Sequence, residues 1–74
     1  MKNIITFASV TNAMKARELL RRHNIPSRMI RTPAKLRKGS CGYSLAVGRD
    51  FEKATQLIVN HNIPYKGIYA DDAR

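Results

Sequence analysis

Apolar positions along the chain follow two spacings, and the pair of spacings occurs twice. Residues 4–9 and 43–47 are short runs rich in apolar and β-branched side chains, which favour β-strands. After each run, apolar residues recur every three or four positions, the spacing of one helix face. These positions are Ala13, Ala16 and Leu20 in the first half, and Phe51, Ala54, Leu57 and Ile58 in the second. Further β-rich segments follow at 28–32 and 66–70, so the pattern predicts the order βαββαβ.

An internal repeat marks the ends of both predicted helices. The tetrapeptide His-Asn-Ile-Pro occurs at 23–26 and again at 61–64, an offset of 38 residues. We expect the histidine to end the helix, the asparagine to take the left-handed conformation, and the isoleucine to pack back on the helix, while the proline prevents continuation. At the other ends, Ser9 or Thr11 is the expected N-cap of the first helix and Asp50 that of the second.

This element order predicts an α+β fold. With right-handed crossovers, the compact solution is a ferredoxin-like βαββαβ sandwich. It has a four-stranded antiparallel sheet of order 4-1-3-2 with both helices on one face, and a length of 74 residues predicts a single domain over residues 1–74. Strand alternation assigns Ile5, Phe7, Ser9, Tyr43, Leu45 and Val47 to the helix-covered face. It assigns Ile4, Thr6, Ala8, Gly42, Ser44 and Ala46 to an exposed face, either solvated or available to a partner.

The charge balance indicates an anionic partner without choosing its class. Fourteen Lys and Arg residues against five Asp and Glu residues give a net charge of +9 and a pI near 10.5. Nucleic acid, an acidic protein and a small anion all fit, and so does a solvated basic surface. One cysteine cannot form an internal disulfide, and residues 1–10 lack a secretory apolar stretch, which together predict a cytoplasmic protein. No run approaches the roughly 18 apolar residues of a membrane span, so no membrane partner is expected.

Cys41 is the residue with the most distinctive chemical surroundings in the sequence. In the predicted topology it opens the third strand, beside the end of the first strand and the first turn of the first helix. Cationic side chains and a helix N-terminus both lower a thiol pKa from about 8.5. The candidate binding residues around it are Ser9, Thr11, Lys35, Arg37, Lys38, Ser40 and Gly42. The alternative is an inert, buried thiol, because free cysteines are among the most frequently buried residues.

The segments "TPAKLRKGSCGYSL" and "ITFASVTNAMKARELL" resemble the selenium/sulfur carrier-like family of small bacterial proteins over nearly the full chain. Thr32 and Pro33 match its Thr-Pro segment, and Cys41 and Gly42 match its Cys-Gly pair, while Ala34 stands where we expect a basic residue. The resemblance implies a carrier whose cysteine accepts sulfur or selenium, as a persulfide or perselenide, from one protein and hands it to another. Cys41 is then the acceptor, and the basic loop docks partners with acidic surfaces.

Two alternatives come from other functional classes. A nucleic-acid-binding module would share its fold with RNA recognition motifs, but "CGYSLAVG" offers only Tyr43 as a base-stacking aromatic, and alternation directs it toward the helices. A regulatory module could bind a small ligand at the sheet edge, as a monomer or small homo-oligomer. The sequence shows no paired carboxylates, no Ser/His/Asp set, no phosphate-binding glycine loop and no metal-ligand cluster. We therefore expect no enzyme activity, no cofactor and no metal.

Overall fold

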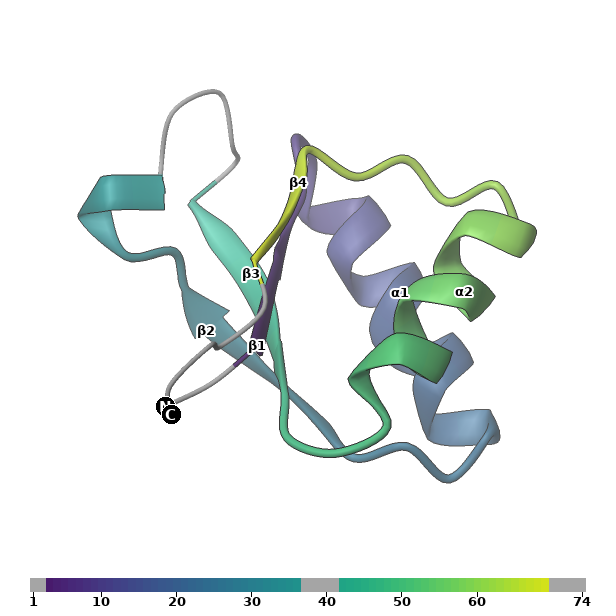
Figure 1. The fold of residues 1–74 in the computed structure, drawn as a ribbon. Coiled ribbons are helices and arrows are strands. Elements are labelled where there is room, and N and C mark those ends of the chain that lie inside the picture. The colour runs from purple at the N-terminus through teal and green to yellow at the C-terminus, as the bar shows by residue number, and fades with distance from the viewer. Residues whose placement is uncertain (1–2, 37–41, 70–74) are drawn as a thin grey trace.

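The computed structural model describes residues 3–36 and 42–69. Its elements are β1 (Asn3–Thr6), α1 (Val10–Arg22), β2 (Ser27–Arg31), a short 3₁₀-helix (Ala34–Leu36), β3 (Tyr43–Val47), α2 (Phe51–Asn60) and β4 (Gly67–Tyr69). The four strands form one antiparallel sheet of order β2-β3-β1-β4, the predicted order read from the opposite edge. Both helices lie on the same side of this sheet (Figure 1). The α+β ferredoxin-like fold is therefore confirmed.

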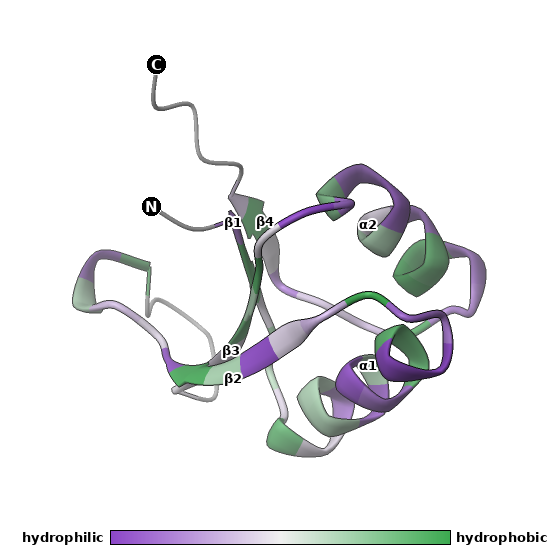
Figure 2. Ribbon diagram, turned by 90° about the horizontal axis from the view of Figure 1, so that it is seen from below, coloured by the Kyte–Doolittle hydropathy of each residue, from purple (hydrophilic) through white to green (hydrophobic). Residues whose placement is uncertain are grey.

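The core lies between the helices and the two central strands. Ile5 pairs with Leu45 across β1 and β3, and both side chains are fully buried. The helices contribute Ala13, Ala16, Leu20, Ala54 and Ile58 to the same cluster. Burying each large aliphatic side chain contributes about 1.5–3 kcal/mol, and the alanines let the helix backbones approach the sheet. Figure 2 shows the hydrophobic central strands facing the helix layer.

The strand boundaries differ from the sequence prediction by a few residues. β1 ends at Thr6, earlier than predicted, because the chain must leave the sheet to begin α1 at Val10. Ser9 is therefore not a strand residue but the N-cap of α1, where its hydroxyl accepts a hydrogen bond of 3.2 Å from the Thr11 amide. β2 begins one residue early, at Ser27, and β4 one residue late, at Gly67. The predicted end of β4 at residue 70 lies outside the described residues.

The repeated tetrapeptide ends both helices as predicted. Asn24 and Asn62 have φ values of 62° and 57°, in the left-handed region. The Ile25 amide donates to the Leu20 carbonyl at 2.9 Å, and the Ile63 amide makes the equivalent bond of 3.1 Å to Ile58. This six-to-one bond defines a Schellman motif, which satisfies carbonyls that the helix end would leave open. Ile25 is buried, so the motif also anchors the chain to the core.

Asp50 is the N-cap residue of α2, as predicted, but its side chain does not make the capping bond. Asp50 does precede α2, but its φ of 58° and ψ of 31° are left-handed, and its side chain makes no cap hydrogen bond. A capping side chain normally stands on extended backbone, which directs its oxygen toward the first-turn amides. The left-handed backbone removes that geometry, and Asp50 contributes only its carbonyl, which accepts from Ala54 at 2.8 Å.

The face of the sheet without helices is less exposed than predicted. Thr6, Ser44 and Ala46 were expected to be open to solvent, yet 1%, 0% and 6% of their surfaces are exposed. Their side chains are small and lie on the two central strands. On the neighbouring edge strand β4, the ring of Tyr69 lies across Gly67, the partner of Thr6: a Cβ at this glycine would stand 2.7 Å from the Tyr69 Oη. Glycine at 67 thus permits the ring to cover this part of the sheet.

Replacing Asn24 tests the helix stop. Asn24→Ala should lower the free energy of unfolding by about 1 kcal/mol, because the Cβ of alanine is sterically disfavoured in the left-handed conformation. Asn24→Gly should preserve or raise stability. Urea unfolding followed by circular dichroism measures both. Asn60→Ala, inside α2, is the matched control and should stay within about 0.5 kcal/mol of wild type. Equal losses for Asn24→Ala and Asn60→Ala would contradict the assignment.

Candidate functional site

One edge of the sheet brings together the segments that were predicted to lie near the cysteine. Thr6, at the end of β1, pairs with Ser44 near the start of β3. The first turn of α1 begins four residues after Thr6, and the Lys66 amide donates to the Thr6 carbonyl at 2.7 Å, which brings back the segment after α2. In Figure 1 the end of β1, the start of β4 and the first turn of α1 lie near the top of the sheet. The predicted neighbourhood of strand ends and helix start is therefore present.

Gly42 directly follows Cys41 and is the described residue nearest to it along the sequence. Its φ of +94° is in the left-handed region, where a side chain is strained, and among the described residues, its chain neighbours apart, no atom lies within 4 Å of the place a Cβ would occupy. Its carbonyl accepts a hydrogen bond of 2.9 Å from the Thr32 amide. The backbone here is thus held to the residue that follows β2, and no other described residue fills the side-chain position of Gly42.

Two buried hydroxyls fix the strands behind this glycine. The Oγ1 of Thr32 and the Oγ of Ser44 form a hydrogen bond of 2.6 Å, and both residues are almost fully buried. A hydroxyl removed from water without a partner costs stability, so this pair favours one arrangement of β2 against β3. Thr32 belongs to the Thr-Pro segment that the sequence singled out. The role of Ser44 was missed, although both residues occupy the same face of adjacent strands.

Tyr43 is not the core residue that alternation predicted. It shares its face with Leu45, but 40% of its surface is exposed, because it stands at the start of β3 beyond the cover of the helices. The guanidinium carbon of its cross-strand neighbour Arg31 lies 5.6 Å from the centre of the ring. This is a cation–π contact, worth about 0.5–1 kcal/mol at an exposed site. An RNA recognition motif carries its base-stacking aromatics on the face of the sheet without helices. Tyr43 lies on the opposite face.

The remaining predicted site residues divide into those the structure describes and those it does not. The hydroxyl of Ser9 is used in capping α1, and Thr11, also exposed, supplies the amide that it accepts from. Lys35 is exposed on the 3₁₀-helix between β2 and β3. Arg37, Lys38, Ser40 and Cys41 lie outside the described residues. The electrostatic setting of the thiol therefore stays a prediction.

A groove along α1 is a feature that the sequence reading missed. It has a volume of about 600 Å³, and its described lining consists of Thr11, Met14, Lys15, Glu18, Leu19, Arg22, His61 and Ile63. The helical positions 11, 15, 18 and 22 recur at one-turn spacing, so the groove follows one face of α1. The apolar periodicity of the sequence marks the opposite, buried face of this helix.

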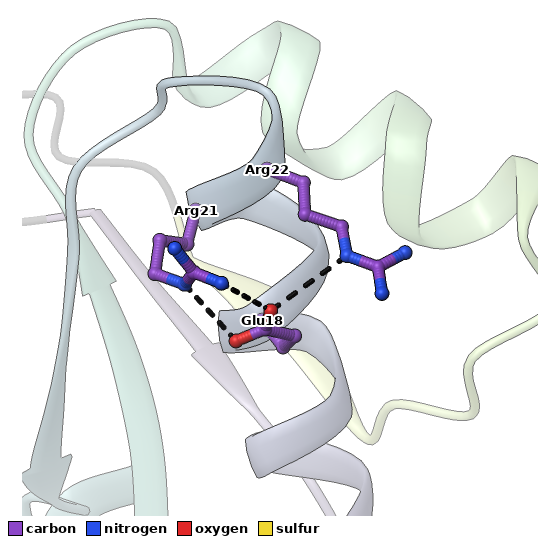
Figure 3. A network of polar contacts seen from close by, with 3 residues as sticks. All are labelled: Glu18, Arg21 and Arg22. Atoms are coloured by element: carbon purple, nitrogen blue, oxygen red, sulfur yellow. Dashed lines mark hydrogen bonds and ion pairs between the residues drawn. The ribbon is translucent and has the colours of Figure 1, made fainter.

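The single acidic residue of α1 is held by two arginines (Figure 3). Arg21 donates from Nε and Nη2 to the two oxygens of Glu18, the Nε bond being 3.1 Å, and the Nε of Arg22 lies 3.6 Å from the same carboxylate. The hydrogen bonds from Arg21 are the main reason that the pKa of Glu18 lies below its ordinary value. Because the group is exposed, we expect only a small contribution to stability, present near neutral pH and lost as pH falls through the lowered pKa.

Residues 3–36 and 42–69 contain no group of three His, Cys, Asp or Glu side chains able to hold a metal ion. Within the same residues, no helix has the length and apolarity needed to span a membrane.

Comparison with protein families identifies the chain. Residues 2–70 match the family described as "Putative Se/S carrier protein-like". The chain belongs to this family. The match to the Se/S carrier-like family spans both halves of the internal repeat and includes the Thr-Pro and Cys-Gly segments. No curated protein and no solved structure matches the chain. The family description names a carrier-like protein.

The hydroxyl pair predicts coupled stability effects. Ser44→Ala should lower the free energy of unfolding by about 1–2 kcal/mol, because it removes the partner of a buried hydroxyl. The double variant Thr32→Val/Ser44→Ala should cost at least about 0.5 kcal/mol less than the sum of the single changes. Urea unfolding measures the cycle. Thr55→Val, at a half-buried position on α2, should combine additively with Ser44→Ala, and additivity in the Thr32 cycle would contradict the coupling.

The contacts of Glu18 with the two arginines predict a lowered pKa for its carboxyl group. In a carboxyl-detected NMR titration at low salt, Glu18 should titrate below the ordinary range of glutamate, and Arg21→Gln should raise its pKa. Arg17→Gln is the matched control, because Arg17 acts on Glu18 only through a weaker, longer-range attraction. A pKa equally affected by both substitutions would contradict the dominant role of the Arg21 hydrogen bonds.

Proposed function

We propose that this protein carries sulfur or selenium on Cys41, accepting the atom from a donor protein and passing it to an acceptor protein. The observation that carries the proposal is the family match over residues 2–70, because that span contains Cys41, the only cysteine of the chain. A lone cysteine that alternates between thiol and persulfide suits a reducing compartment, so we place this activity in the cytoplasm.

The transfer needs one thiolate and no further catalytic group. The Cys41 thiolate attacks the outer sulfur of a donor persulfide, a new S–S bond forms, and the donor S–S bond breaks. The donor sulfur leaves as a thiolate with the bonding electrons, and Cys41 becomes the persulfide. Delivery repeats the exchange on the outer sulfur of Cys41, with the Cys41 thiolate as leaving group. No external oxidant or reductant enters, and access and thiolate character set the rate.

The surroundings of Gly42 support an accessible thiol. Cys41 directly precedes Gly42 in the sequence, and among the described residues, the chain neighbours of Gly42 apart, no atom lies within 4 Å of the place a Cβ of Gly42 would occupy. The hydrogen bond from Thr32 to Gly42 holds the backbone at this position. The described residues therefore leave room beside Gly42 for a docking protein.

Charge supports the thiolate form. The first turn of α1 begins at the same sheet edge, contains no acidic residue, and carries the partial positive charge of a helix N-terminus. Lys35 is exposed on the connection between β2 and β3, and Arg37 and Lys38 follow it in sequence. Cations of this kind lower a thiol pKa, and the same residues attract partners with acidic surfaces.

Loading of Cys41 tests the proposal directly. After incubation with a small-molecule persulfide donor and removal of excess reagent, intact-protein mass spectrometry should show the addition of one sulfur atom. The addition should map to Cys41, and a thiol acceptor should reverse it. Cys41→Ser, with its fold checked by circular dichroism, should gain no mass. Unmodified wild-type protein beside a readily loaded free thiol in the same reaction would contradict the proposal.

A further inference from the structure

The groove along α1 combines an apolar surface with cations at its rim. Met14 is exposed over 57% of its surface, while Leu19 and Ile63 are half-buried and lie deeper. Exposed methionine adapts its shape to different partners and is common on surfaces that bind helices. The residues from Thr11 to Arg22 extend over about 16 Å of helix, the length of three turns of a partner helix.

The charge at the rim is positive. α1 carries Lys15, Arg17, Arg21 and Arg22 against Glu18 alone. Arg21 satisfies both oxygens of Glu18, and within the described part of the chain no carboxylate pairs with Lys15. Lys15 and Arg22 both line the groove. The Nε of Arg22 lies 3.6 Å from Glu18, but its two terminal nitrogens point away from that carboxylate (Figure 3), so they and Lys15 can meet acidic side chains of a partner.

We propose that this groove binds an acidic amphipathic helix of the protein that supplies or receives the sulfur or selenium, an inference that rests on the proposed carrier function. The partner helix places apolar side chains at i, i+4 and i+7 against Met14, Leu19 and Ile63, and carboxylates beside Lys15 and Arg22. Because Thr11 belongs both to the groove and to the first turn of α1, a helix bound here reaches the edge from which β3 begins.

The lining favours a protein segment over nucleic acid. Apolar side chains lose water favourably only against apolar surface, which a phosphate backbone does not offer. The described lining contains no Phe, Tyr or Trp on which a base could stack.

A designed peptide probes the groove. The probe is a helical peptide of about 12 residues with leucines at i, i+4 and i+7 and glutamates elsewhere. In methyl NMR of the full chain it should shift the Met14 signal and leave that of Met29, which packs against the core from β2. Its affinity should fall with salt. A peptide of the same composition with the leucine stripe scrambled should bind at least about tenfold more weakly.

Charge reversal provides the matched control. Lys15→Glu/Arg22→Glu should lower affinity for the leucine-striped peptide about tenfold or more, with the fold checked by circular dichroism. Arg49→Glu/Lys53→Glu makes the same change in net charge at exposed positions that do not line the groove, and it should leave affinity nearly unchanged. Equal losses for the two double variants, or equal binding of the scrambled peptide, would overturn the proposal. A mixed-sequence RNA oligonucleotide that shifts the Met14 signal when the peptide does not would also overturn it, if Lys15→Glu/Arg22→Glu abolishes that shift.

The two proposals fail in different ways. Loading from a small-molecule persulfide needs no docking, so Lys15→Glu/Arg22→Glu should load Cys41 as wild type does. If Cys41 loads but the peptide does not bind, the groove proposal is wrong and the carrier function stands. If the peptide binds but Cys41 never loads, the carrier function is wrong, and the assignment of the groove to a sulfur or selenium donor or acceptor is overturned with it.

Discussion

The antiparallel pairing of β1 with β3 is the contact on which the rest of the structure depends. By joining Thr6 to Ser44 and Ile5 to Leu45, it places the end of the first strand beside the start of the third. The first turn of α1 and the segment returning from α2 follow to the same edge. Without this pairing, nothing would bring the glycine that follows the cysteine close to the start of α1, because the two belong to different halves of the sequence.

The internal repeat explains the fold, and its two halves differ outside the core. Both helices end in the same Schellman motif and bury the same small and aliphatic side chains. Their outer faces differ: α1 carries four basic residues and one acidic residue, whereas α2 carries only Glu52 and Lys53. One helix thus offers a cationic groove while the other completes the core. The Cys-Gly pair likewise occurs in only one half of the chain.

Periodicity and the repeated tetrapeptide were sufficient to predict the element order, the sheet topology and both helix stops, because these depend on local spacing and backbone preference. The errors arose where tertiary context decides. Tyr43 has the alternation of a core residue but lies beyond the helices, and Ser44 and Thr6 have that of exposed residues but are covered. The backbone of Asp50 is set by the turn that precedes α2. The groove along α1 arises only where α1 meets the segment that follows α2, so helical spacing alone does not predict it.

The central claim is that Cys41 is an accessible thiolate at neutral pH. The rate of its alkylation, measured against pH in the native protein and in the urea-unfolded protein, tests this most directly. The account predicts that the native thiol reacts readily with a pKa below about 8.5, and that replacing Lys35, Arg37 and Lys38 with glutamine raises this pKa. A thiol that reacts only after unfolding, or that titrates at or above its ordinary value in the native protein, would contradict it.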